Sequence, residues 1–179
     1  NHFQSSEYQN DKRNIKQMNE SHSMYRYAKL EEQIAALKPF DDQKVAKVLR
    51  DYTGLNKKNI GFGNEKALNQ LLAHHAVIFR PEKKLVYVSS APYNLGEFTV
   101  YDLGRLNDTF SVETNILVEE LKIPKDEFVN TQAFKDYEEY KVFRGLIHQK
   151  SEQKEIIPEE TIQHYIQLNP EFWEVYYDA

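Results

Sequence analysis

The chain contains no cysteine among its 179 residues. This absence excludes disulfide bonds, thiolate metal sites and a cysteine nucleophile within the chain itself. It says little about the compartment, because a chain without cysteine is compatible with reducing and with oxidising surroundings. Glycine and proline are also scarce, with six of each, which argues against a linker or a fibrous protein.

Long hydrophobic runs and dense blocks of Lys and Arg are absent as well. A bilayer-spanning helix needs roughly 20 consecutive apolar residues, so no membrane span is expected. The formal net charge is -5. Nucleic acid is therefore not expected as a partner, because binding to its phosphate backbone needs a clustered positive surface.

Hydrophobic and aromatic residues, in contrast, are plentiful. Hydrophobic residues make up 40% of the chain, which includes 12 Tyr and 10 Phe. A chain of this length and composition can bury a substantial core, so we expect it to fold.

The first part of the chain favours helices after a polar opening. Residues 1–20 are rich in Asn, Gln, Ser and Lys, and we expect loop or extended chain there, with at most a short strand. Apolar residues at three- and four-residue spacing predict a helix over residues 23–39 and a second over residues 41–54. Asp41 or Asp42 is expected to cap the second helix.

The middle of the chain changes to a strand pattern, and the end returns to helices. Strands are predicted at residues 77–79, 85–90 and 98–103, the first two forming a hairpin. From Val112 onward, helices are predicted over residues 112–122, 131–150, 158–169 and 170–178, with Thr131 as an N-cap. The fold class is therefore α+β. Three strands leave sheet edges exposed unless other strands pair with them, which favours a missing upstream half.

Several conspicuous features have ordinary structural interpretations. His74 and His75 are adjacent in a strand-like segment, so their side chains would face opposite sides and could not readily share a metal ion. The segment "GFGNEK" lacks the remaining residues of a phosphate-binding loop and is typical of a tight turn. The aromatic residues of the last helices are expected to serve core or partner packing.

Three segments carry a resemblance to a known family. They are "NHF" at residues 1–3, "SMYR" at residues 23–26 and "HHAVIFRPEKKLVYVSSAPYNLGEFTVYDL" at residues 74–103. In this order they resemble the downstream half of a cysteine-type N-terminal-nucleophile hydrolase. The similarity is to the acyl-coenzyme A:6-aminopenicillanic acid acyltransferase-like proteins and, more distantly, to the choloylglycine hydrolases. It covers about residues 1–105, and the helical tail has no counterpart in it.

The resemblance implies an αββα sandwich, with residues 1–107 as its downstream part and residues 108–179 as a helical extension packed on it. Asn1 matches the family Asn whose side-chain amide helps to form the oxyanion hole, and Arg26 matches an active-site Arg at a helix start. The family nucleophile is a Cys at the start of the catalytic chain. The resemblance therefore implies a fragment that is inactive alone, whose partner is the upstream half of the same polypeptide. It also implies a small amide or acyl substrate, and no cofactor or metal.

Two other hypotheses remain open. The chain could be a non-catalytic domain that binds a protein or peptide through its small sheet and its aromatic helices, or it could retain the family fold without the nucleophile. Without the resemblance, Asn1 is an ordinary terminal residue and Arg26 a surface Arg whose stem covers apolar neighbours. Three further questions stay open: the substrate acyl group, the choice between hydrolysis and acyl transfer, and the compartment. Export from a bacterial cell is compatible with the family.

Overall fold

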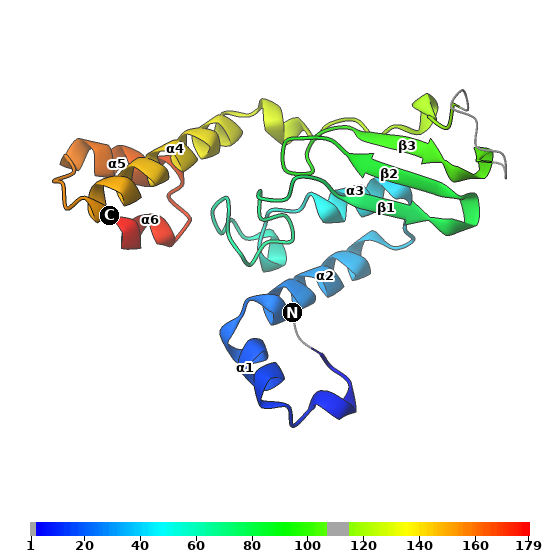
Figure 1. The fold of residues 1–179 in the computed structure, drawn as a ribbon, viewed down its shortest axis with the longest axis horizontal. Helices are drawn as coiled ribbons and strands as arrows, with labels where there is room; N and C mark the ends of the chain where they lie inside the picture. Colours follow the sequence, from blue (N-terminus) through cyan, green and yellow to red (C-terminus); the bar gives the residue numbers. More distant parts are fainter. Residues whose placement is uncertain (1–2, 107–114) are drawn as a thin grey trace.

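The computed structural model describes residues 3–106 and 115–179. This part of the chain forms an α+β structure in which helices flank one three-stranded antiparallel sheet (Figure 1). None of the helices in these ranges is long and apolar enough to cross a membrane. The elements, in chain order, are α1 (Lys12–Glu20), α2 (Ser23–Leu37), α3 (Asp42–Leu49), β1 (Val77–Arg80), β2 (Leu85–Ser89), β3 (Phe98–Asp102), α4 (Gln132–Glu152), α5 (Glu159–Leu168) and α6 (Glu174–Asp178).

The sheet has the strand order β1-β2-β3, and the predicted hairpin is confirmed. A short 3-10 turn over Pro81–Lys83 joins β1 to β2, and Lys84 closes it in the left-handed conformation, with φ of 54°. Ile78 of β1 lies opposite Tyr87 of β2, which in turn lies opposite Val100 of β3. Because side chains alternate along a strand, this register assigns each residue to one face of the sheet.

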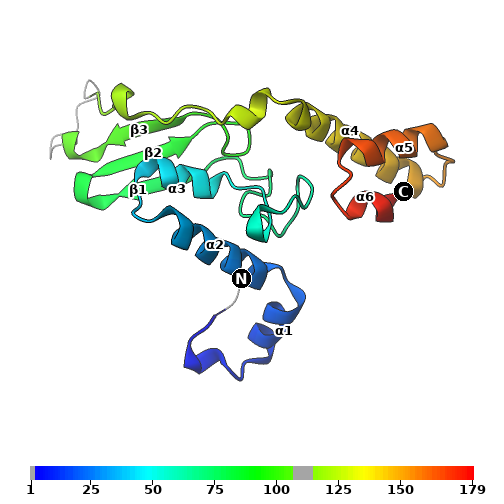
Figure 2. The ribbon, with the colours of Figure 1, turned by 180° about the vertical axis from the view of Figure 1, so that it is seen from behind.

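Helix α3 covers one face of the sheet (Figure 2). Its Ala46 is buried in one core cluster with Ile78, Tyr87 and Val100. The Tyr87 hydroxyl donates a hydrogen bond of 2.6 Å to Asp42 Oδ2 at the start of α3. Burial and this bond raise the pKa of Tyr87 to about 12, so the contact between sheet and helix persists across the physiological range.

The opposite face of the sheet is also largely apolar. Two cross-strand rows lie on it: Val77, Val88 and Thr99, and Phe79, Val86 and Tyr101. The Phe79 side chain is 69% exposed and Val77 is 37% exposed. Figure 1 looks onto this face, and no helix of the described chain lies over it. We call these six residues the open sheet face.

A second core joins the helical tail to the loops around the hairpin. Tyr137, Tyr140 and Tyr165 of the tail are buried together with Leu71 and Leu95, which precede and follow the hairpin. The predicted N-cap of the longest helix is confirmed, since Thr131 Oγ1 accepts a hydrogen bond of 3.2 Å from the Phe134 amide. The tail therefore packs on the loops of the α+β part.

Two predictions for the first part of the chain are wrong in detail. The polar opening contains helix α1, which starts where Asp11 Oδ1 accepts a hydrogen bond of 2.7 Å from the Asn14 amide. A helix with few apolar residues shows little of the three- and four-residue apolar spacing that predicts helices, so the sequence pattern there predicts a loop. The second helix is capped by Asp41 as expected, but it ends at Leu49 and does not reach Gly54. After it the chain turns, so that Asp51 and Thr53 can bind Lys29.

The helix predicted over residues 112–122 is also wrong for its described residues, 115–122. This segment runs beside β3, with Leu117 opposite Tyr101 and Ile123 opposite Phe98 in isolated antiparallel bridges. Its only helical stretch is a 3-10 turn over Glu119–Leu121. Pairing with a distant strand outweighed local helix propensity, as is common for short apolar segments.

Candidate functional site

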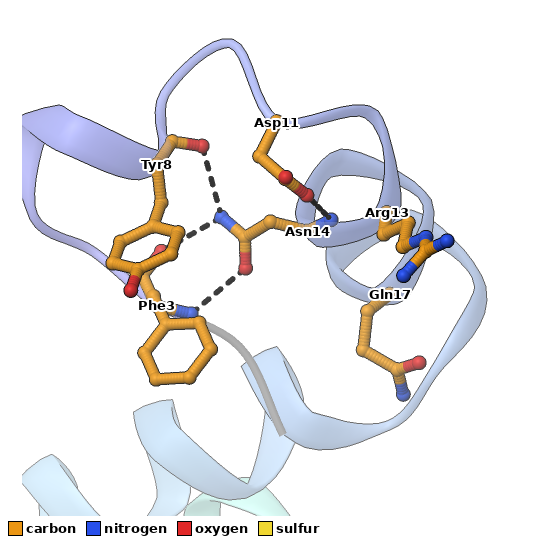
Figure 3. A pocket seen from close by; sticks show the side chains of 6 residues that line it. All are labelled: Phe3, Tyr8, Asp11, Arg13, Asn14 and Gln17. Atoms are coloured by element: carbon orange, nitrogen blue, oxygen red, sulfur yellow. Dashed lines mark hydrogen bonds between the residues drawn. The ribbon is translucent and has the colours of Figure 1, made fainter.

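Asn1, the predicted oxyanion-hole donor, lies outside the described residues. The backbone of Phe3, the first residue that the structure describes, is held by the side chain of Asn14 in α1 (Figure 3). Asn14 Oδ1 accepts from the Phe3 amide at 2.8 Å, and Asn14 Nδ2 donates to the Phe3 carbonyl at 2.9 Å. The same amide also donates to the Tyr8 carbonyl at 3.3 Å. One side chain thus fixes the backbone two residues after Asn1.

The surroundings of Phe3 form a small open pocket. The Phe3 and Tyr8 rings stack with centroids 4.5 Å apart. The pocket has a volume of about 320 Å³, and its lining residues are Phe3, Tyr8, Asp11, Arg13, Asn14 and Gln17 (Figure 3). The rings of Phe3 and Tyr8 and the charged side chains of Asp11 and Arg13 give this pocket both apolar and charged surface.

Arg26, the second predicted site residue, lies in the first turns of α2, as expected. Its guanidinium Nη1 donates a short hydrogen bond to the backbone carbonyl of Glu65. Nearby, His22 Nε2 lies 3.8 Å from Glu65 Oε2. Arg26 therefore fastens the start of α2 to the glycine-containing loop around residues 61–65.

Of the two predicted site residues, the structure describes Arg26 alone. Arg26 is not among the residues that line the pocket at Phe3. The "GFGNEK" segment forms the predicted turn, and both Gly61 and Gly63 have positive φ angles, near 80°. Arg26 is therefore positioned by a tight turn, whereas Phe3 is positioned by Asn14 of α1.

A charged cluster that sequence reasoning missed lies further along α2. The Lys29 side chain is fully buried, and its Nζ lies 2.9 Å from Glu32 Oε1 and 3.2 Å from Asp51 Oδ2. Thr53 Oγ1 lies 3.3 Å from the same ammonium. A buried ammonium requires such partners, because desolvation of an unpaired charge is very costly.

The carboxylates of this cluster have further donors. Asp51 accepts from the Gln33 side chain at 2.5 Å and from the Thr53 amide at 2.8 Å. Glu32 accepts from the Asn56 amide at 2.7 Å, and this bond, followed by the one from Lys29, lowers the pKa of Glu32. The cluster lies beside a groove of about 690 Å³ between α2 and the end of α3. The contacts of Lys29, Glu32 and Gln33 with residues 51–56 tie α2 to the loop after α3, which makes the cluster a structural clamp.

Replacing Lys29 with Met should lower the free energy of unfolding by about 2 to 3 kcal/mol, because Asp51 would lose its buried counter-charge but keep its other donors. Urea unfolding followed by circular dichroism measures this. Lys47→Met, an exposed change beside the same groove, should stay within about 0.5 kcal/mol of the unsubstituted chain. If Lys29→Met lowers the free energy of unfolding no more than Lys47→Met does, the buried pair of Lys29 and Asp51 does not stabilise the fold.

The remaining candidates carry less chemistry. His74 and His75 are both exposed in the loop before β1. Among residues 3–106 and 115–179, no group of three or more His, Asp or Glu side chains is placed to hold a metal ion. In the tail, the Tyr165 hydroxyl donates to Asp178 Oδ2 at 2.8 Å, and burial, together with this bond, raises the pKa of Tyr165. This contact fastens α6 to α5.

Comparison of the chain with protein-family models, curated proteins and solved structures found no match. Function must therefore be argued from the residues and their geometry.

Proposed function

We propose that this chain is the downstream part of an amide (C–N) bond hydrolase or acyltransferase. Its N-terminal Cys nucleophile would belong to the upstream half of the same polypeptide. In this proposal Asn1 supplies an oxyanion-hole donor and Arg26 an active-site cation, while the sheet is one layer of an αββα sandwich. The proposal rests on the motif resemblance of residues 1–105 together with one structural observation, the open sheet face.

The open sheet face supports the proposal because large exposed apolar patches mark surfaces that another part of a protein covers, and five of its six residues are Val, Phe or Tyr. Helix α3 buries one face, and the register places Phe79, Val86 and Tyr101 on the other. β1 also has an unpaired edge within the described sheet. A second sheet from the upstream half, stacked roughly 10 Å away, would bury this face and complete a four-layer structure.

The proposed chemistry uses few groups. The thiolate of the upstream Cys attacks the amide carbonyl, and its α-amino group acts as the base. The amine leaves with a proton, and the resulting thioester passes its acyl group to water or to another acceptor. The Asn1 amide N–H would stabilise the oxyanion by ~3 kcal/mol. A cation such as Arg26 favours the thiolate over the thiol.

The 179-residue chain alone should show no amidase activity, because it has no Cys. A panel of acyl p-nitroanilides with acetyl, phenylacetyl and long-chain acyl groups measures this through release of p-nitroaniline. A longer product of the same gene, containing the upstream half, should release p-nitroaniline from at least one substrate of the panel. The proposal would be contradicted if the purified 179-residue chain released p-nitroaniline and the Arg26→Ala substitution abolished this activity.

A second candidate function, peptide binding by the tail, is favoured by one observation. Trp173, Tyr176 and Tyr177 at α6 are large aromatic residues with exposed side chains, Tyr177 being 83% exposed. Aromatic side chains of this kind are enriched in binding surfaces. Two results together would favour this function over the enzyme. Peptides selected for binding to the chain would fail to bind the Trp173→Ser variant, and the full gene product would contain no reactive Cys.

A further inference from the structure

We propose that the groove between α2 and the end of α3 is a binding site for a small organic carboxylate with an apolar body. The volume of the groove is about 690 Å³. Sites for small molecules typically measure about 300 to 1,000 Å³ and combine apolar walls with a few polar groups. This inference goes beyond the proposed function and does not depend on it.

Three cationic side chains line the groove without a bound carboxylate. Lys47 of α3 and Lys57 of the following loop are exposed, and neither forms a hydrogen bond or an ion pair with the part of the chain that the structure describes. Arg50 is buried, with 8% of its surface exposed, and its Nε and Nη2 donate to three backbone carbonyls. Nη1 of Arg50 has no partner within residues 3–106 and 115–179, so it can donate to a ligand.

The carboxylates of the groove are mostly engaged. Glu32 and Asp51 bind Lys29 and the other donors of the structural clamp. Asp126 accepts a hydrogen bond of 2.9 Å from the Phe128 amide through Oδ1. With Lys29 included, four cations face three carboxylates, which gives this region a net charge of +1 in a chain whose net charge is -5. The groups that lack a partner therefore favour an anion.

Tyr52 gives the groove a fixed apolar wall. Its ring is half-buried and packs against Phe128 and Phe62, with centroids 4.3 Å and 5.5 Å away. Ala36 and Leu37 of α2 add apolar surface. Burial raises the pKa of Tyr52, so its hydroxyl stays protonated at neutral pH and can donate a hydrogen bond. An apolar body beside this ring would place a terminal anionic group among the cations.

A carboxylate fits these groups better than a free phosphate does. A guanidinium nitrogen and an ammonium can each bind one oxygen of a carboxylate. The carbonyl bonds of Arg50 hold its guanidinium in place before a ligand arrives, which lowers the entropic cost of binding. A dianion would meet Asp126 with a larger repulsion, and it would leave the Tyr52 ring uncovered.

Titration of the isotope-labelled 179-residue chain with hydrocinnamate, followed by two-dimensional NMR of the amide groups, tests the proposal. Kd should lie below about 1 mM, with the shifts concentrated in residues 50–57. Hydrocinnamamide has the same body without the charge, and acetate has the charge without the body. Each should bind at least about tenfold more weakly than hydrocinnamate, because each lacks one of the two features that the groove recognises.

A pair of double variants places the site. Lys47→Met with Lys57→Met removes two cations that make no contact in the described fold, and it should weaken hydrocinnamate binding at least about tenfold. Lys12→Met with Lys135→Met changes the net charge by the same amount at exposed positions that do not line the groove, and it should leave Kd within about twofold. Arg50 stays unchanged in both variants, because its carbonyl bonds hold the fold.

Four results would overturn the proposal. They are equal Kd values for hydrocinnamate and its amide, equal Kd values for the two double variants, tighter binding of inorganic phosphate than of hydrocinnamate, and no binding at about 10 mM hydrocinnamate. None of these results bears on amidase activity, so the proposed function is tested separately.

Discussion

Replacing Arg50 with Met should lower the free energy of unfolding by about 3 to 5 kcal/mol, since two buried carbonyls and one partly buried carbonyl would lose their donor. The guanidinium of this buried residue donates to the carbonyls of Asn94 at 3.1 Å, Gly96 at 2.6 Å and Pro124 at 2.9 Å. It also lies over the Phe98 ring, 5.1 Å from the centroid. One side chain at the end of α3 thus joins the loops on both sides of β3.

Burial lowers the pKa of Arg50, yet an Arg keeps its charge throughout the range in which proteins fold. Arg50→Lys tests the geometry at constant charge. An ammonium cannot reproduce the planar fork of the guanidinium, so about half of the loss should remain. Urea unfolding measures the free energy of unfolding of both variants, with Lys47→Met in α3 as the control. A loss below about 1 kcal/mol for Arg50→Met would mean that water or a shifted loop satisfies the three carbonyls.

The second large effect concerns turnover. Under the proposed function, Asn1→Ala in the gene product with its upstream half should lower kcat by about 100- to 1,000-fold, the usual cost of removing one oxyanion donor. KM should change little, because the donor acts on charge that develops in the transition state. Steady-state kinetics with the p-nitroanilide that the unsubstituted enzyme hydrolyses measures both constants.

Arg26 provides the companion variant. Arg26→Ala should reduce kcat and also loosen the loop at Glu65, whose carbonyl it binds. Arg26→Lys keeps the charge, so the pH profile should still show the low thiol pKa that the proposal expects for the upstream Cys, even where kcat falls. Asn1→Ala and Arg26→Ala variants that both turn over like the unsubstituted enzyme would refute the assigned site.

The elements with strong local signals were predictable from the sequence. Alternating residues on both sides of the turn at Pro81 give the hairpin, and Thr131 marks the start of α4 because its hydroxyl can bind the Phe134 amide. These features depend on neighbours within a few residues, which a sequence pattern reports directly.

The elements that depend on distant partners were not predictable in the same way. Leu117 and Ile123 form bridges to Tyr101 and Phe98, so a segment with helical spacing becomes extended. Lys29 is typical of an exposed helix residue, and only the return of Asp51 beside α2 makes its burial possible. Each of these outcomes is decided by a contact that sequence spacing does not reveal.

The candidate site shows the same division. The apolar spacing after Arg26 correctly predicted the helix that contains it, but the contact with the Glu65 carbonyl depends on a loop 39 residues away. Asn14 lies in a polar stretch without any catalytic motif, and its two hydrogen bonds to the Phe3 backbone span 11 residues that no sequence pattern links. The open sheet face depends on the strand register, which places Phe79 and Val86 on the side of the sheet away from α3.

The most direct test of the proposed function is the intact mass of the full gene product, measured with and without iodoacetamide. The proposal predicts removal of a leader that ends immediately before a Cys, and a mass increase for one alkylation at that new N-terminus. An unprocessed polypeptide without a reactive Cys would contradict the proposal and would leave a binding domain or a relative that has lost its nucleophile.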